Sequence, residues 1–70
     1  MNIEIIKPVF KCTTDEEIFF QRITGIDGFR LVTANEKCLQ VSVAESDKQV
    51  ALDQIATICT LWNASFTVTS

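Results

Sequence analysis

The most regular pattern of apolar and polar positions lies between Ser46 and Trp62, where apolar residues recur every three or four positions. This spacing predicts a helix with one apolar face. Ser46 followed by Gln49 has the spacing of a capping box, and Asn63 suits the left-handed residue that often ends a helix. We therefore expect one long helix that covers a sheet. Its predicted apolar stripe consists of Ala51, Leu52, Ile55, Ala56, Ile58, Cys59 and Trp62.

Four other segments have the composition and alternation of β-strands. The first is rich in Ile, Val and Phe, and Pro8 predicts a bend within it. Asp27 and Gly28 form a turn signal before the second strand. The third and fourth alternate between apolar and polar residues, which is typical of a sheet with one buried face. The predicted strands are residues 2–11, 29–33, 38–44 and 64–69.

A second helix is predicted to begin at Thr13 or Thr14, because each is followed three positions later by a glutamate. Gly25 then provides a stop. A strand over residues 14–24 is the alternative, because the run Ile-Phe-Phe-Gln-Arg-Ile also has a high β propensity. If the segment is helical, the residues expected on its buried side are Ile18, Phe19, Phe20 and Ile23.

The predicted order is strand, helix, strand, strand, helix, strand. This order is the ferredoxin-like βαββαβ plan of α+β proteins, a four-stranded antiparallel sheet with two helices on one face. The first and third strands would then be central, and the second and fourth would be edges. We expect residues 1–70 to form one compact domain. If the first helix is instead a strand, the prediction becomes a mostly antiparallel sheet crossed by one long helix.

The composition is that of a folded domain, with 47% hydrophobic and 21% charged residues. Six basic and nine acidic residues give a formal net charge of -3. This charge disfavours binding to nucleic acid or to an anionic membrane, since both depend on a basic surface. No apolar run approaches the roughly 20 residues of a membrane-spanning helix, and the first residues, with Glu4 among them, lack the basic start of a signal peptide. We therefore expect a cytoplasmic protein.

Patterns for catalysis and metal binding are missing from the sequence. The chain has no His, which is the commonest general base and metal ligand. Cys12, Cys38 and Cys59 lie too far apart for a zinc or redox motif, so we expect free thiols and predict no metal, no cofactor and no enzyme. Cys12 is the candidate for a reactive thiol, because Lys11 and the predicted helix start both favour a thiolate. The alternative is an inert cysteine.

The segment Gly28-Phe29-Arg30-Leu31-Val32 resembles a strand of the RNA-recognition motifs, which share the βαββαβ order. The repeated aromatic residues of that family are missing and the net charge is negative, so no RNA binding is predicted. The order of elements also resembles acylphosphatases and ACT-type ligand-binding domains. The sequence has neither the phosphate-binding loop with its arginine nor a glycine-bearing ligand loop. Fold alone does not define function.

A dimer is predicted, because so short a chain buries little surface by itself. Ile6, Phe10 and Val32 would form an apolar patch on the sheet face away from the helices. Alternatively, a bulge at Pro8 turns Phe10 back into the core. Residues expected beneath the helices are Ile3, Ile5, Leu31, Val41, Phe66 and Val68.

Two further surfaces are candidates for self-association. The last strand, residues 64–70, would be an edge without any charge to discourage pairing. Val50 and Leu61 project away from the main stripe of the long helix. Trp62 is expected in the core, with a binding anchor as its alternative role.

Two functions are consistent with these features. The first is a small binding or accessory module that acts through contact with itself or with another protein. The second is a small-molecule sensor, which the ACT resemblance implies, with the ligand held between subunits. An enzyme that uses Cys12 or scattered carboxylates ranks last.

Overall fold

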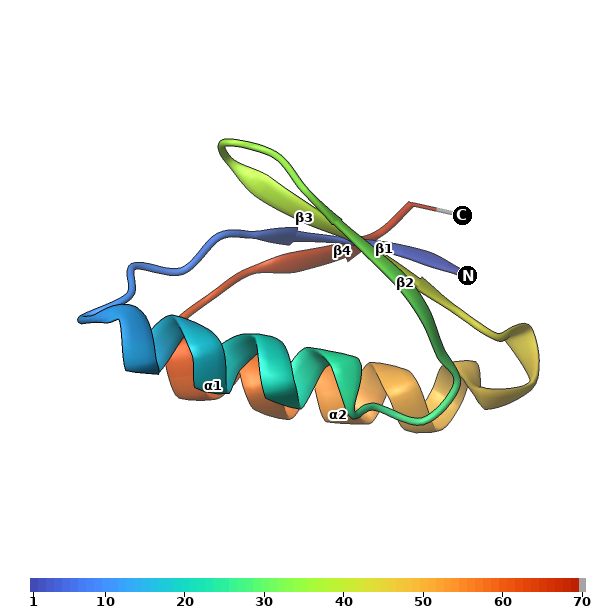
Figure 1. The fold of residues 1–70 in the computed structure, drawn as a ribbon. Helices are drawn as coiled ribbons and strands as arrows, with labels where there is room; N and C mark the ends of the chain where they lie inside the picture. The colour runs from blue at the N-terminus through green and yellow to red at the C-terminus, as the bar shows by residue number, and fades with distance from the viewer. Residues whose placement is uncertain (70) are drawn as a thin grey trace.

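The computed structural model describes residues 1–69 and has the predicted ferredoxin-like α+β architecture. Both helices lie on one face of a four-stranded antiparallel sheet (Figure 1) with the strand order β2-β3-β1-β4. The first helix is therefore a helix and not a strand. The elements are β1 (Asn2–Ile6), α1 (Thr13–Thr24), β2 (Phe29–Ala34), β3 (Cys38–Val43), a short 3₁₀ turn (Glu45–Asp47), α2 (Lys48–Trp62) and β4 (Phe66–Val68).

The sheet is built around β1, which pairs with β3 on one side and with β4 on the other. Ile3 lies opposite Val41 of β3 and Val68 of β4, so these side chains share the face that the helices cover. The predicted central and edge strands are therefore confirmed. The buried core consists of Ile3, Ile5, Phe19, Ile23, Ile26, Leu39, Val41, Val43, Ala51, Ile55, Ile58 and Cys59.

The helix ends agree only in part with the predicted capping residues. Asn63 ends α2 in the left-handed conformation, with φ 54° and ψ 37°, as predicted. The predicted cap at Ser46 is wrong, because Ser46 lies inside the 3₁₀ turn and α2 begins two residues later. In α1 the residue before the helix is Cys12, whose side chain makes no capping hydrogen bond. Gly25 ends α1 at φ -93°, so its stop does not use a left-handed residue.

A β-bulge in β2 reverses two of the predicted side-chain directions. Phe29 lies opposite Val43, but the next residue to face a partner is Leu31, opposite Ser42, so Arg30 is an extra residue in the strand. The extra residue turns Leu31 to the open face, where it is 61% exposed, and Val32 toward the core. The predicted positions of Leu31 beneath the helices and of Val32 on the open face are therefore wrong.

The first strand is shorter than the predicted residues 2–11, because β1 ends at Ile6. Pro8 is buried, and the turn beyond it brings Phe10 against α1. The Phe10 ring lies 5.4 Å from the Phe19 ring and 6.5 Å from that of Phe20, measured between centroids. The alternative that Phe10 returns to the core is confirmed.

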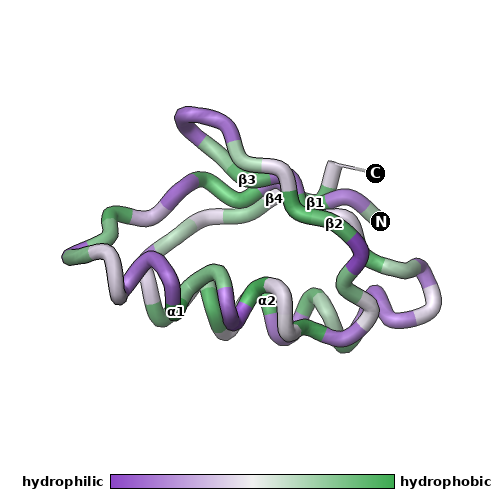
Figure 2. The backbone as a smooth tube through the Cα atoms, in the orientation of Figure 1, coloured by the Kyte–Doolittle hydropathy of each residue, from purple (hydrophilic) through white to green (hydrophobic). Residues whose placement is uncertain are grey.

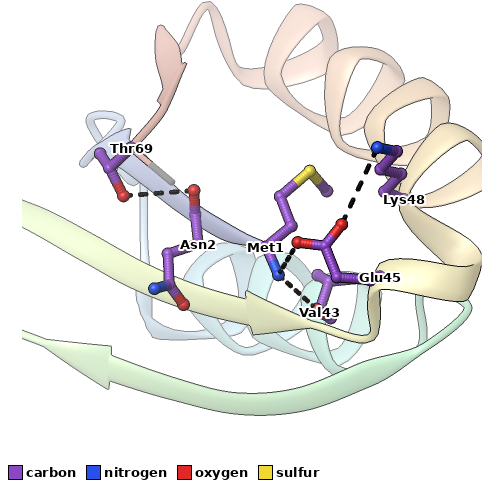
Figure 3. Close-up of polar contacts among 6 residues, drawn as sticks. All are labelled: Met1, Asn2, Val43, Glu45, Lys48 and Thr69. Carbon is purple, nitrogen blue, oxygen red and sulfur yellow. Dashed lines mark hydrogen bonds and ion pairs between the residues drawn. The ribbon is translucent and has the colours of Figure 1, made fainter.

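The strand ends are joined by a small set of polar contacts (Figure 3). The Met1 amino group donates to the Val43 carbonyl oxygen at 2.9 Å and lies 3.2 Å from Glu45 Oε1. The backbone N–H of Thr69 donates to the Asn2 carbonyl oxygen at 2.8 Å, and the Thr69 hydroxyl donates to the same oxygen at 3.2 Å. These last two bonds continue the pairing of β1 and β4 beyond Val68.

Candidate functional site

The structure separates the five residues that the sequence predicts as an interface. Ile6 is exposed on the sheet face away from the helices, whereas Phe10 and Val32 pack against the core. The predicted patch of these three residues therefore does not exist. Val50 and Leu61 are both exposed on α2. Of the five, Leu61 alone lines the groove described below.

The open face of the sheet is largely polar. Gln40 Nε2 donates to Glu4 Oε2 at 2.9 Å across the central strands. Ile6 and Leu31 are the large apolar residues exposed here, and they lie opposite positions 38 and 42 of β3. At about 3.3 Å per residue, those positions are about 13 Å apart along the strand. The hairpin that joins β2 to β3 is hydrophilic at its tip (Figure 2). This face offers no continuous apolar surface.

A groove of about 730 Å³ lies where the loop after β1, the start of α1 and the end of α2 meet. These three segments converge at the left of Figure 1. We call this surface the Trp62 groove. Val9 is 91% exposed, Leu61 is 60% exposed, and Ile18 is also exposed, so apolar side chains converge here from three segments. The lining residues are Val9, Lys11, Asp15, Ile18, Arg22, Leu61, Trp62 and Asn63.

Trp62 is held in place from three sides. Its ring packs edge-on against Phe19, with 5.2 Å between the centroids and 81° between the planes. Its Nε1–H donates to Asp15 Oδ1 at 3.0 Å, and the Arg22 guanidinium lies 5.9 Å from the centre of the ring. The indole is half-buried and belongs to both the core and the groove.

The charges of the groove leave two cations available. Asp15 is engaged by the protein itself, because Oδ1 accepts from Trp62 and Oδ2 accepts from the Lys11 backbone N–H at 3.2 Å. Lys11 and Arg22 make no ion pair with any of residues 1–69, where the ion pairs join Glu45 to Met1 and to Lys48. Both cationic side chains are exposed. The groove therefore combines apolar walls with two positive charges that lack a carboxylate partner among these residues.

Sequence reasoning missed most of this groove. Ile18 was expected on the buried side of α1, and its exposure shows that this prediction is wrong. The signal that identifies the groove is the spacing of Asp15, Ile18 and Arg22, which places them on one face of α1 beside α2. Val9 has no comparable signal, because its position depends on the irregular loop after β1.

The three cysteines are free and differ in exposure. Cys12 is exposed before α1, Cys38 is half-buried and Cys59 is buried. Burial raises the pKa of the Cys59 thiol above its ordinary value of 9.0, which favours the unreactive protonated form. Within residues 1–69, no three Cys, Asp or Glu side chains are arranged to hold a metal ion. Across the same residues, neither helix has the length and apolar character needed to span a bilayer.

Comparison with known proteins gives no match to any protein-family model, any curated protein or any solved structure.

Proposed function

We propose that this protein is a binding module that acts through contact with a partner protein, and that the Trp62 groove is its contact surface. The observation that carries the proposal is the convergence of Val9, Ile18 and Leu61 around the half-buried Trp62. Exposed apolar side chains gathered from separate segments are typical of protein-contact surfaces. Trp and Arg are also the residue types that most often dominate binding energy at such surfaces.

The partner segment is an amphipathic one that carries carboxylates beside its apolar side chains. Its apolar residues would cover Val9, Ile18 and Leu61. Its carboxylates would pair with Lys11 and Arg22, which have no ion-pair partner among residues 1–69. Opposite charges at the rim of a contact surface favour specificity and rapid association.

Trp62 offers a direct measurement, because it is the only tryptophan in the chain. The probe is a tryptophan-free synthetic peptide with Leu and Glu on one helical face, compared with a peptide in which Lys replaces each Glu. We expect the acidic peptide to change Trp62 fluorescence in a saturable way and the basic peptide to bind at least about tenfold more weakly.

Two matched substitutions separate the groove from the rest of the surface. Leu61→Glu places a carboxylate in the groove and should weaken binding of the acidic peptide by about tenfold or more. Leu31→Glu is the control, because Leu31 is exposed to the same degree, 61% against 60%, but lies on the open face of the sheet. Equal losses in both variants, equal affinity for both peptides, or no saturable response would contradict the proposal. A Trp62 response to free amino acids without one to peptides would favour a small-molecule sensor instead.

A further inference from the structure

The edge strand β4 presents unpaired backbone groups to solvent. Ile6 N–H donates to the Ser65 carbonyl oxygen at 2.8 Å, and Thr69 N–H donates to the Asn2 carbonyl oxygen at 2.8 Å. The N–H and C=O groups of successive residues point to opposite sides of a strand. Those of residues 65, 67 and 69 therefore point toward β1. Those of Phe66 and Val68 therefore point outward, at the edge of the sheet.

This edge is complementary to a second copy of itself. A two-fold axis at Thr67 would place Phe66 of one copy opposite Val68 of the other, in an antiparallel pair. The outward amides and carbonyls of both residues would then find partners in both copies. Phe66 and Val68 side chains lie on the helix-covered face, where an aromatic residue against a β-branched one is a favourable cross-strand pair. On the open face, Thr67 would meet Thr67.

The flank of α2 above this edge suits the same arrangement. Gln49 and Leu52 line a hollow together with Val68, so this side of the helix lies over β4. Ala56 and Thr60 follow Leu52 at helical spacing on the same flank. Glu45 and Lys48 line the same hollow at the start of α2, but Gln49, Leu52, Ala56 and Thr60 are uncharged, and Leu52 and Ala56 are half-buried. Between Leu52 and Thr60 the flank therefore offers uncharged surface that a neighbouring helix can cover.

The spacing of helices and strands also allows the α2 helices of two copies to pack against each other. Two helices share one face of four strands, so each helix spans about two strands. Adjacent strands are about 4.8 Å apart. A sheet that continues through β4 would thus bring the two α2 helices to about 9.6 Å, within the 8–10 Å range of packed helices.

The last part of the chain, which supplies the end of α2 and β4, carries no charged side chain. All fifteen charged residues, six basic and nine acidic, lie between positions 4 and 53, and none follows Asp53. Natural sheet edges are normally protected by charges, bulges or proline. β4 has none of these between Phe66 and Val68, and its protection is limited to its short length.

We propose that two copies of this chain associate through an antiparallel pairing of β4 with β4 about Thr67, supported by the two α2 flanks. The residue predicted at the end of this edge, Ser70, lies outside the described residues. The Trp62 groove faces α1, on the opposite flank of α2, and stays open in the dimer. The pairing is independent of the partner binding proposed above.

Sedimentation equilibrium in the micromolar range tests the pairing. We expect a dimer mass for the wild type. Val68→Pro removes an outward N–H without breaking the β1–β4 pairing and should give a monomer mass. Ala34→Pro is the matched control, because Ala34 N–H also points outward, at the β2 edge. This control should stay dimeric.

A second variant covers the case in which Val68→Pro does not fold, as judged by circular dichroism. Thr67→Lys faces Glu4 within its own chain, so the fold should tolerate it, but it brings two lysines together at the two-fold axis. It should lower the association constant at least tenfold at low salt, and less at high salt. A monomeric wild type, an Ala34→Pro monomer, or an unchanged dimer in the folded β4 variants would overturn the proposal.

Discussion

The Trp62 ring packs against the core, and its Nε1–H donates a hydrogen bond to Asp15. The contribution of this bond to the free energy of unfolding can be measured. Trp62→Phe keeps the aromatic contact with Phe19 but loses the Nε1–H that donates to Asp15. We expect it to lower the free energy of unfolding by about 1–2 kcal/mol. Asp15→Ala should cost at least as much, since it loses the same bond and also the bond from the Lys11 N–H.

Urea unfolding of both single variants and the double variant isolates the bond. The loss in the double variant should be smaller than the sum of the single losses by about 1 kcal/mol. Contributions of Asp15 that do not involve Trp62 cancel in this comparison, including its favourable position in the first turn of α1. Strictly additive losses would show that the bond contributes nothing to stability.

Cys59 predicts how stability depends on pH. Burial raises the pKa of its thiol in the folded state above the ordinary 9.0, so the folded protein holds this proton more tightly than the unfolded chain does. The resulting stabilisation is fully present below the unfolded pKa and is lost as pH rises through the folded pKa. The urea midpoint should therefore fall between about pH 8 and about pH 10.

Cys59→Ala is the control for this titration, because it removes the thiol and leaves every lysine in place. It should be less stable than wild type near pH 8, because it leaves a small cavity. Its urea midpoint should then fall less steeply between the two pH values. Parallel pH profiles for the two proteins would show that Cys59 does not contribute.

Residue preferences predict some of these features and miss others. Asn63 could be identified as a helix stop, because few residues other than Gly and Asn adopt the left-handed conformation readily. The exposure of Ile18 could not, because its neighbour Phe19 is buried and the sequence does not show where α2 lies. A residue on the flank of a helix is buried or exposed according to what packs beside it.

The connection between α1 and β2 contains two glycines, and only Gly28 is at a position that requires glycine. Gly28 has φ +74°, and a Cβ added there would lie 2.6 Å from Asp47 Cβ. Gly28→Ala should therefore lower the free energy of unfolding by about 1–3 kcal/mol. Gly25 has φ -93°, and its added Cβ would lie 3.2 Å from the Gln21 carbonyl oxygen. Gly25→Ala should change the free energy of unfolding by less than about 1 kcal/mol.

Thermal unfolding of the two variants decides between these expectations. Similar melting temperatures for both would mean that the close approach of Gly28 to the 3₁₀ turn is not a constraint on the fold. The sequence marks Gly28 as part of a turn, but only the structure shows that Asp47 is its neighbour, nineteen positions later.

Among the elements, β3 and α2 were predictable because their apolar residues recur with one period throughout. β2 was not, because a single extra residue changes the phase in mid-strand and so exchanges Leu31 and Val32 between the two faces. Arginine has no preference for bulges that would identify Arg30 as the extra residue from the sequence. The pairing with β3 places it, and that pairing is invisible in the sequence of β2 alone.

At the scale of the whole molecule, the order of the elements was sufficient to predict the architecture. Chain-crossing and handedness rules leave few arrangements for six such elements. The Trp62 groove is different, because its walls come from residues 9 to 63 and their meeting depends on the loop after β1. A loop of this kind has no period from which its path can be derived.

The extra residue in β2 has a consequence for the size of any assembly. A dimer joined through β4 still ends in two β2 strands, one at each side of a longer sheet. If those strands were flat and uncharged, further copies could add without limit, and the product would be a filament. The kink at Arg30 and its charge make that addition unfavourable. In the proposed β4 dimer, growth would therefore end at two chains, and one inserted residue far from the contact would keep the particle finite.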